Sequence, residues 1–477
     1  MHKLNQFYIN GEWQDAGIVG HLEITNPATG GTIGEIAMGN ADHINQAVAA
    51  AKEAFKTFSK TTKKERLGYL ERMLELYNER YDDIADAIRQ EMGAPKEFSK
   101  TDQAFTGRRH ITTAIEALKN IPLSEDREGY QLRHEPIGVC GLITPWNWPI
   151  NQIACKVPPA IAAGCTMVLK PSEFSPLSAK MFAEIIHDSG VPKGVFNMVF
   201  GDGPTVGATL SEHPDVDMIS FTGSTRAGIA IAQAAAPTIK RVSQELGGKS
   251  PVILTDDIDL EKVVPNCVWL CMENTGQSCN AGTRLLVPAK LHDQVVDIAV
   301  KATAGYKTGN PLEDDTDIGP LANKGQFEKV KAILEEAEKH YPKPVIGGAG
   351  PVEGLDADHE NGFFVKPTIY AGLDNDHMIA KQEVFGPVLA ILPYETLDEA
   401  IEIANDTPYG LSSYIYSNDD KTIDRLTSEL RTGMVHVNGA SLAPMGPFGG
   451  YKQSGNGREW GQFGLEEFLE IKSVLKK

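Results

Sequence analysis

The residues best suited to chemistry lie around Cys279, in the stretch Glu273–Arg284, which reads Glu-Asn-Thr-Gly-Gln-Ser-Cys-Asn-Ala-Gly-Thr-Arg. Small and polar residues surround this cysteine, whereas a structural cysteine normally lies among aliphatic side chains. Gly276 and Gly282 flank it and predict close turns that present the sulfur to a cleft. The stretch therefore predicts a nucleophilic thiol, with an incidental cysteine in a small-residue loop as the alternative.

Asn147 is a candidate hydrogen-bond donor in the stretch Thr144–Pro149 (Thr-Pro-Trp-Asn-Trp-Pro). Prolines and tryptophans restrict this backbone, so the amide can be held in one orientation. Together with the backbone N–H of Cys279, this amide would form an oxyanion hole. The alternative is a turn in which Asn147 bonds its own backbone.

Glu245 is a candidate general base, in the stretch Gln244–Gly248 (Gln-Glu-Leu-Gly-Gly). Its neighbours are a leucine and paired glycines, a setting in which a carboxylate can be partly desolvated. Desolvation raises the pKa of a carboxyl group and makes it a usable base. The alternative is a surface glutamate at the end of a strand.

Composition narrows the classes of protein that need to be considered. The 477 residues are too many for one compact core, so we expect two or three domains. A net charge of −19 argues against nucleic acid or an anionic membrane as the partner. The N-terminus has no signal-peptide pattern, and six irregularly spaced cysteines predict neither disulfides nor a metal site. These features predict a cytoplasmic protein that binds no metal.

Short apolar runs alternate with helical patterns from Gly138 onwards, which predicts an α/β fold with a parallel sheet. A second α/β region follows from about Gly248 to Pro444, and the polar residues Ile121–Arg133 predict an arm. Parallel sheets of this kind bind ligands at the carboxyl ends of their strands. The predicted strands of the first region are Val139–Ile143, Met167–Lys170, Val195–Phe200, Met218–Phe221 and Val252–Leu254, with a helix at Asn151–Ala163 among those between them.

Candidate cofactor contacts follow several of these strands. Lys170 and Glu173 are placed to hold ribose hydroxyls, although an exposed Lys and Glu before a helix are common. The glycine-containing stretches Gly201–Gly207 and Phe221–Gly228 open helices, where free backbone N–H groups attract phosphate. Neither is a true Rossmann fingerprint. Gly247–Ser250 fails as a phosphate loop of the Walker type because position 243 is serine.

Seven stretches, in this order and spacing, resemble the aldehyde dehydrogenase superfamily over essentially the whole chain. They are Thr144–Pro149, Leu169–Glu173, Phe221–Ser224, Glu245–Gly248, Thr275–Arg284, Glu383–Pro387 and Pro447–Gly455. The resemblance implies an aldehyde dehydrogenase-like α/β fold with a Rossmann-type NAD(P)-binding domain, an α/β catalytic domain and a small β oligomerisation arm. The implied ranges are 1–120 and 134–247 for the first, 248–444 for the second, and 121–133 with 445–477 for the third.

The resemblance also implies a role for each matching residue. Cys279 is the nucleophile, Glu245 the general base and Asn147 the oxyanion donor, while Lys156 and Glu459 assist proton removal. Cofactor-contact positions are Trp146, Lys170, Glu173, Gly203, Gly207, Gly223, Ser224, Glu383 and Phe385. Positions of the aldehyde tunnel are Trp148, Asn151, Gln152, Cys155, Leu442 and Phe448.

The implied reaction oxidises an aldehyde to the carboxylic acid through a thiohemiacetal and a hydrolysed thioester on Cys279. We expect NAD to be preferred and NADP to be possible, because a 2′-phosphate beside Glu173 would meet repulsion of up to about 4 kcal/mol. Medium-chain aliphatic or aromatic aldehydes are the expected substrates, and the protein is expected to be a homodimer or homotetramer. The alternatives are a CoA-acylating dehydrogenase, whose members generally lack a base at Glu245, and an inactive binding or structural homologue.

Overall fold

A computed structural model describes residues 1–17 and 19–475. Ile18 of the predicted cofactor domain and Lys476–Lys477 of the predicted tail therefore lie outside the described residues. The largest sheet has seven strands in the order β12-β11-β8-β9-β10-β2-β3. β12, β11, β8, β9 and β10 run parallel, and the N-terminal hairpin of β2 and β3 joins antiparallel to β10. The bounds are β2 Gln6–Ile9, β3 Glu12–Asp15, β8 Val139–Ile143, β9 Thr166–Lys170, β10 Phe196–Met198, β11 Met218–Thr222 and β12 Arg241–Glu245.

Helices pack against this sheet through apolar stripes. In α1, Ile44, Ala47, Val48 and Ala51 recur at helical spacing and are buried, while Asn40 caps the N-terminus with its side chain. The other helices of this part are α2 Lys63–Glu79, α3 Tyr81–Met92, α4 Lys96–Phe98, α5 Phe105–Asn120, α6 Pro149–Ala154, α7 Val157–Ala163, α8 Pro176–Asp188, α9 Ala208–Glu212 and α10 Thr225–Ala235; α1 spans Ala41–Phe58, and π-helical turns lie at Ser99–Ala104 and Gly203–Gly207.

The helix predicted over Asn151–Ala163 is two helices, α6 and α7, and the prediction of one helix is wrong. Pro158 and Pro159 lie in the first turn of α7. Proline cannot continue a preceding helix but is tolerated in the first turn of a new one. The break falls at Cys155 and Lys156, which are thereby set at a helix junction.

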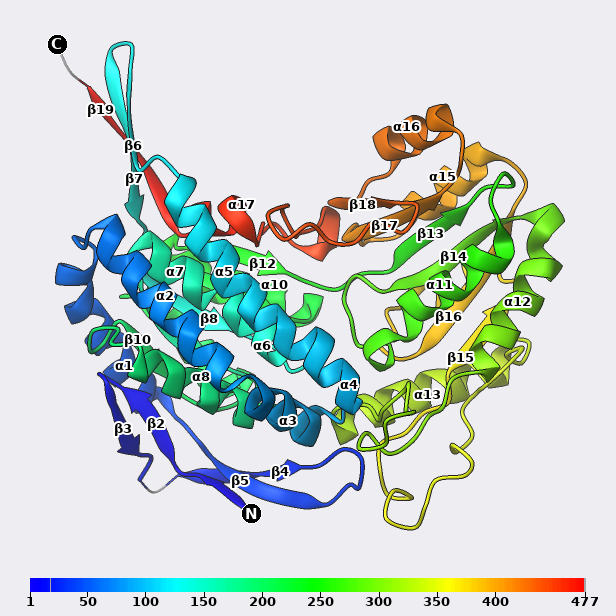
Figure 1. The fold of residues 1–477 in the computed structure, drawn as a ribbon, viewed down its shortest axis with the longest axis horizontal. Coiled ribbons are helices and arrows are strands. Elements are labelled where there is room, and N and C mark those ends of the chain that lie inside the picture. The colour runs from blue at the N-terminus through cyan, green and yellow to red at the C-terminus, as the bar shows by residue number, and fades with distance from the viewer. Residues whose placement is uncertain (18, 476–477) are drawn as a thin grey trace.

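A second sheet of six parallel strands has the order β15-β16-β14-β13-β17-β18 and lies on the right of Figure 1. Its first edge strand, β15, begins at Thr368, directly after Pro367, which has no N–H for a ladder. The strands are β13 Ser250–Leu254, β14 Gly282–Pro288, β15 Thr368–Ala371, β16 Val388–Tyr394, β17 Ser412–Tyr416 and β18 Met434–Val437, and the helices are α11 Leu260–Met272, α12 His292–Ala304, α13 Lys324–His340, α14 Met378–Lys381, α15 Leu397–Asn405 and α16 Asp420–Glu429.

The predicted arm is an antiparallel hairpin that is completed by the end of the chain. β6 (Ser124–Arg127) pairs with β7 (Tyr130–Pro136), and β7 pairs with β19 (Leu469–Leu475), which follows α17 (Gly461–Glu466). Figure 1 shows this three-stranded sheet projecting from the body of the molecule. A further small sheet near the N-terminus contains β1 His2–Leu4, β5 Thr32–Met38 and β4 Gly20–Thr25. The domain ranges given above remain a proposal.

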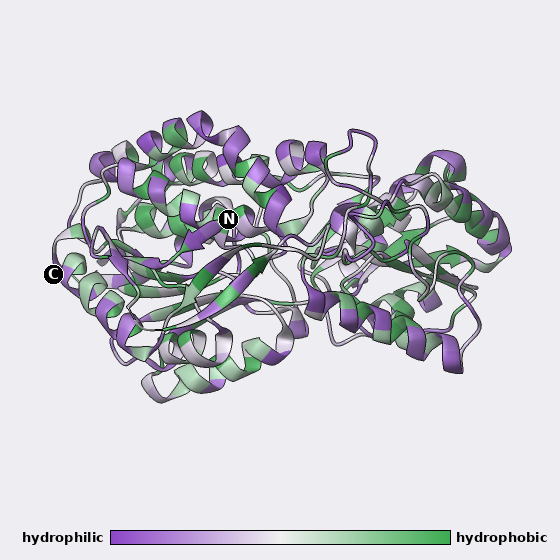
Figure 2. Ribbon diagram, turned by 90° about the horizontal axis from the view of Figure 1, so that it is seen from below, coloured by the Kyte–Doolittle hydropathy of each residue, from purple (hydrophilic) through white to green (hydrophobic). Residues whose placement is uncertain are grey.

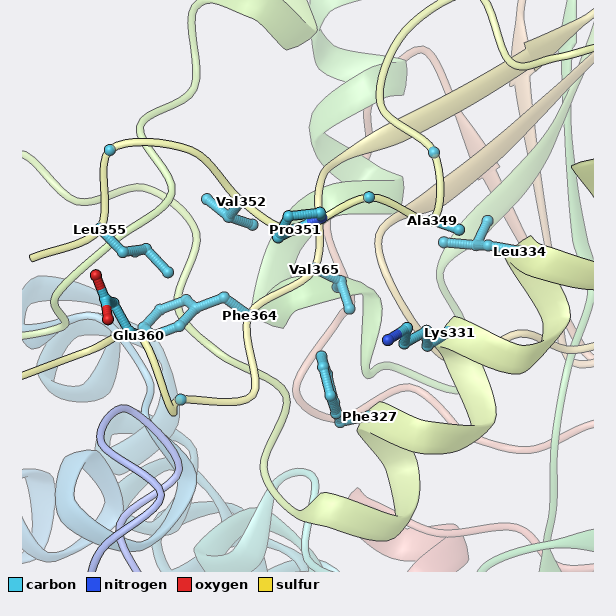
Figure 3. A pocket seen from close by; sticks show the side chains of 14 residues that line it. Phe327, Lys331, Leu334, Ala349, Pro351, Val352, Leu355, Glu360, Phe364 and Val365 are labelled. Carbon is cyan, nitrogen blue, oxygen red and sulfur yellow. The ribbon is translucent and has the colours of Figure 1, made fainter. Parts of the chain in front are cut away.

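Hydropathy follows these layers. In Figure 2 the hydrophobic residues concentrate along the strands and the helix faces turned towards them, and the outer faces are hydrophilic. No helix among the described residues has both the length and the apolar character that crossing a membrane requires. The segment 342–362 contains no helix or strand and passes over the surface. Phe327 and Lys331 on α13 face Phe364 and Val365 across a cavity of about 530 Å³ beside this segment (Figure 3).

Candidate active site

The parallel strands of the large sheet place their carboxyl ends along one edge. Ile143 at the end of β8 is in register with Lys170 on β9 and with Phe221 on β11. Thr222 on β11 is in register with Glu245, the last residue of β12. The segments that follow these strands therefore meet at the same edge, although they are far apart in sequence.

A cavity of about 190 Å³ lies at this edge and contains the three central residues of the prediction. Cys279, Glu245 and Asn147 all line it. The remaining lining residues are Pro145, Trp146, Thr222, Gly223, Ser224, Leu246, Gly247, Gln326, Lys329, Glu383 and Phe385. The cavity thus joins a thiol, a carboxyl group and an amide that come from three separate parts of the chain.

Side-chain amides fix the position of Asn147. Its Nδ2 donates to the carbonyl of Gln277 at 2.9 Å, which leaves its second N–H for another acceptor. Its own backbone carbonyl accepts hydrogen bonds from Gln103 Nε2 (3.1 Å) and Asn274 Nδ2 (2.9 Å). The backbone N–H of Cys279 donates no hydrogen bond within the described residues. The two donors that an oxyanion hole needs are therefore both available.

The loop that carries Cys279 has an unusual backbone. Asn274 and Thr275 have φ of 53° and 56°, in the left-handed region that non-glycine residues rarely adopt. Gly276 follows with φ of 70°, and a Cβ there would lie 2.1 Å from the carbonyl carbon of Gly386. A Cβ at Gly248 would lie 2.3 Å from the carbonyl oxygen of Cys279. Glycine is needed at both places because two backbones approach each other closely.

Glu245 is a buried carboxyl group without a hydrogen bond. It is 2% exposed, and neither carboxyl oxygen has a partner among the described residues. Its neighbours include Gly449 and Gly457, where a Cβ would approach Oε1 to 2.8 and 2.9 Å. Burial, followed by the negative charge of Glu459, raises the pKa of Glu245 well above its ordinary value. Sequence reasoning did not assign these two glycines, because their spacing along the chain does not indicate what they contact.

The thiol of Cys279 is partly exposed to the cavity and is protonated in this environment. Burial is the largest factor that raises its pKa, and the charges of Glu245, Glu383 and Glu459 add to it. The backbone N–H of Asn280 acts in the opposite direction. The thiol therefore requires proton removal before it can attack an electrophile.

Lys156 and Glu459 form a buried ion pair behind the cavity. Lys156 Nζ donates to Glu459 Oε1, and the side chains are 1% and 8% exposed. Burial is the largest influence and lowers the pKa of Lys156, but the charge and hydrogen bond of Glu459, with smaller contributions from Cys155 and Glu245, together raise this pKa above its ordinary value. Cys155 Sγ donates to Glu459 Oε2 at 3.3 Å. The helix break at Cys155 and Lys156 places both side chains on the same carboxylate.

The predicted cofactor positions fall into two groups. One lines the cavity: the rings of Trp146 and Phe385 meet edge to face at 5.7 Å, and Glu383 Oε1 accepts from the N–H of Gly248 at 2.9 Å. Gly223 and Ser224 line it as well, and Ser224 also caps α10. The other group lies outside the cavity lining, along the same strand ends, and consists of Lys170, Glu173, Gly203 and Gly207.

The predicted tunnel positions also fall into two groups, those beside Cys279 and those that contact other residues. Leu442 and Phe448 pack with Cys155 and Cys279 in one apolar cluster. Trp148 donates from Nε1 to Ser278 Oγ at 2.8 Å, beside the cysteine. Asn151 bonds His110 instead, at 2.7 Å between Oδ1 and Nε2, and Gln152 is buried with its Oε1 unpaired within the described part of the chain.

Sequence reasoning missed several residues of this site. Trp460 stacks on Phe448 with ring centroids 4.8 Å apart and belongs to the same cluster. Gln326 and Lys329, on α13, line the cavity. Helical periodicity alone could not indicate them, because exposed polar positions of α13 look alike in sequence. Among the described residues, no group of His, Cys, Asp and Glu is arranged to hold a metal ion.

Comparison with known proteins identifies the family to which this arrangement belongs. Residues 13–474 match the aldehyde dehydrogenase family, and the chain belongs to it. The chain is 49% identical over 476 residues to a 3-succinoylsemialdehyde-pyridine dehydrogenase from a Pseudomonas species, covering 100% of this chain and 99% of that protein. The resemblance inferred from the sequence and the predicted α/β fold class are both confirmed.

Solved structures agree over the whole chain. An aldehyde dehydrogenase from Bartonella henselae has a TM-score of 0.97 and 43% identity, covering 100% of both chains. A variant of aldehyde dehydrogenase C from Pseudomonas syringae, crystallised with NAD+ and octanal, has a TM-score of 0.96 and 46% identity, covering 99% of this chain and 96% of the other. A Mycobacterium tuberculosis aldehyde dehydrogenase in complex with NAD+ has a TM-score of 0.96 at 35% identity, covering 100% and 98%.

Proposed function

We propose that Cys279 is the nucleophile, Glu245 the general base and Asn147 the oxyanion donor with which this NAD-dependent aldehyde dehydrogenase oxidises an aldehyde to the corresponding carboxylic acid. The observation that carries the proposal is that these three side chains line one cavity. Their chemistry matches the family to which the chain belongs, and relatives with the same fold have been crystallised with NAD+.

The residues act in sequence on one carbonyl. The sulfur of Cys279, once deprotonated, attacks the aldehyde carbon, and the resulting oxyanion receives hydrogen bonds from Asn147 Nδ2 and the Cys279 N–H. Bound NAD+ supplies the oxidant that accepts a hydride from this thiohemiacetal. Glu245 then takes a proton from water, which attacks the thioester and releases the acid. A base with a raised pKa is suited to this step because its unpaired oxygens accept protons readily.

The strand-end residues fit a dinucleotide. A Cβ at Gly203 would meet nothing within 4 Å, so the backbone there is open to an approaching phosphate. Thr222 Oγ1 is buried beside the cavity and has no partner within the described residues. Lys170 Nζ pairs with Glu173 Oε2 at 2.9 Å, which holds the carboxylate expected to take ribose hydroxyls. We infer that Glu173 makes NAD the preferred cofactor, and a higher kcat/KM with NADP would contradict this.

Glu245 also bears on the acyl acceptor. Its position on the cavity favours water as the acceptor over CoA, and the joint presence of Cys279, Glu245 and Asn147 in one cavity speaks against an inactive homologue. Medium-chain aliphatic or aromatic aldehydes remain the proposed substrates, in line with the apolar cluster of Leu442, Phe448 and Trp460. The arm supports the proposal of a homodimer or homotetramer, and the cytoplasmic location remains a prediction from the sequence.

The test is NADH absorbance with purified protein, NAD+ and a panel of linear and aromatic aldehydes, without CoA. Steady turnover to the free acid is expected, and Cys279→Ala should abolish it. Absence of NADH with every aldehyde, while NAD+ binding is intact, would contradict the proposed oxidation. Turnover that requires CoA would support the acylating alternative.

A further inference from the structure

A second large cavity lies beside the apolar cluster of the active site. It has a volume of about 980 Å³ and lies between α2, α5 and the segment Ala443–Met445, which directly follows Leu442. Its floor combines apolar groups, among them Leu74 and Met445, with two adjacent arginines, Arg108 and Arg109. We call this cavity the vestibule.

Neither arginine has an acidic partner among the residues that the structure describes. Within the described residues neither forms an ion pair or a side-chain hydrogen bond; Arg109 is half-buried, and its buried Nε is unpaired. Arg109 lies over the indole of Trp460 at 4.8 Å, and Arg108 lies over Tyr81 and Phe105 at 5.5 and 5.1 Å. Stacking of this kind leaves the edge of a guanidinium free for a bidentate acceptor.

The acids of the vestibule do not neutralise this pair. Asp82 is engaged with Lys100 Nζ at 2.8 Å. Glu116 lines the same cavity from further along α5 and is exposed. Asp102 acts on Arg109 electrostatically without forming an ion pair with it. A guanidinium whose charge is not neutralised by a nearby carboxylate attracts an anionic ligand.

Trp460 connects the vestibule to the reacting sulfur. One side of its ring stacks on Phe448, which packs with Cys155, Leu442 and Cys279, and Arg109 lies over the ring as well. Its backbone has φ of 74°, a conformation that bulky residues rarely adopt. Such strain persists only where the surroundings enforce it, and it commonly marks a ligand site. The packed side chains of Phe448 and Trp460 thus link the thiol to the guanidinium.

We propose that Arg109, assisted by Arg108, selects aldehydes that carry a carboxylate at the end remote from the carbonyl group. The aldehyde would reach Cys279 while the spacer lies along Phe448 and Trp460 and the carboxylate pairs with the guanidinium. This inference rests on the proposed function and defines its substrate class more closely. Arg109 is a specificity-determining residue in this arrangement, since it touches the substrate but not the reacting atoms.

The test compares three matched series of short to medium length with NAD+: aldehydes with a terminal carboxylate, their methyl esters, and n-alkanals. We expect kcat/KM of the wild type to favour each acid over its ester by about ten- to a hundredfold. In Arg109→Met this ratio should fall towards one, through a higher KM for the acid rather than a lower kcat. Arg109→Lys should retain part of the ratio, because lysine keeps the positive charge but lacks the planar guanidinium that binds a carboxylate through two hydrogen bonds.

Arg425→Met is the matched control, since it removes an exposed arginine of α16 that pairs with Asp398 and Glu429. Its acid-to-ester ratio should equal that of the wild type. A wild-type ratio near one, or a ratio unchanged in Arg109→Met, would overturn the inference. We also expect dicarboxylates to inhibit the wild type more strongly than monocarboxylates do. This second measurement does not depend on the folding of a variant. Turnover of n-alkanals by the wild type tests the proposed function separately.

Discussion

The polar groups on the two sides of Cys279 differ in their hydrogen bonding: those near Asn147 are paired, and the carboxyl group of Glu245 is not paired within the described residues. On the amide side, hydrogen bonds between 2.9 and 3.2 Å link Asn147, Asn274, Gln277 and Gln103. On the carboxyl side, Glu245 is buried with both oxygens unpaired among the described residues. A buried polar group without a partner costs about 1–3 kcal/mol, so a fold retains one only where something else requires it. The comparison indicates that hydrogen bonds fix the position of the Asn147 amide, while the carboxyl group of Glu245 stays available to accept a proton.

Removal of the carboxyl group of Glu245 should have the largest effect on the rate of turnover. In Glu245→Gln we expect steady-state kcat to fall by about 10²–10⁴, because water is no longer deprotonated. NADH should still form in a burst of one equivalent per active site, since thiohemiacetal formation and oxidation precede hydrolysis. Stopped-flow absorbance gives the burst, and mass spectrometry of the intact protein detects the accumulated thioester on Cys279.

Glu273→Gln provides the control for this experiment. Burial raises the pKa of Glu273 to about 7, and this residue lies on the cysteine loop but does not line the cavity. Its kcat should remain close to that of the wild type. A Glu245→Gln variant with normal steady-state turnover would show that another group activates water.

The amide side should contribute somewhat less to the rate. Asn147→Ala removes one oxyanion donor, for which we expect a loss of about 10²–10³ in kcat, or about 2.7–4 kcal/mol. Asn280→Ala is the comparison, because that amide adjoins Cys279 in sequence but donates to Tyr414 Oη at 3.3 Å. Steady-state kinetics with one aldehyde measure both variants. Equal losses in the two would argue that Asn147 acts only through the fold.

The network behind Asn147 should affect stability more than chemistry. Asn274→Gly keeps the left-handed backbone but removes the donor shared by the carbonyls of Asn147 and Gln277. We expect a loss of about 1–3 kcal/mol in the free energy of unfolding and only a small loss in kcat. Asn274→Ala should lose about 1–2 kcal/mol more, because φ of 53° disfavours a Cβ. Urea unfolding of both variants measures this, and equal stability of wild type and Asn274→Gly would contradict it.

The pH dependence should be the mildest effect. Burial raises the pKa of both Cys279 and Glu245, and both groups act in their deprotonated forms. The rate should therefore rise as pH increases from neutral into the alkaline range. In Glu245→Gln the dependence of the NADH burst should reflect Cys279 alone. A burst rate that falls with rising pH in the wild type would contradict this assignment.

Much of the fold and of the site could be predicted because local patterns carried them. Apolar runs indicated β8, β9, β11 and β13, and the segments after the first three of these strands contain predicted cofactor contacts. The split between α6 and α7 was missed because helical periodicity outweighed the two prolines. β14 was not predicted because it begins at Gly282, directly after the polar loop of Cys279. Trp460 and the two arginines gave no signal, since an isolated aromatic and a pair of helix arginines are ordinary features of a surface.

The sequence by itself determined which chemical groups are present and that they follow strand ends. Side-chain chemistry depends on the residue type alone, and short-range periodicity depends only on neighbouring residues. Only the tertiary structure decided that the amide of Asn147 reaches the carbonyl of Gln277, 130 positions away, and that Glu245 has no hydrogen-bond partner in the described part of the chain. Parallel register, close backbone contacts at glycines and burial set those relations. Each of them depends on residues that are distant in the chain.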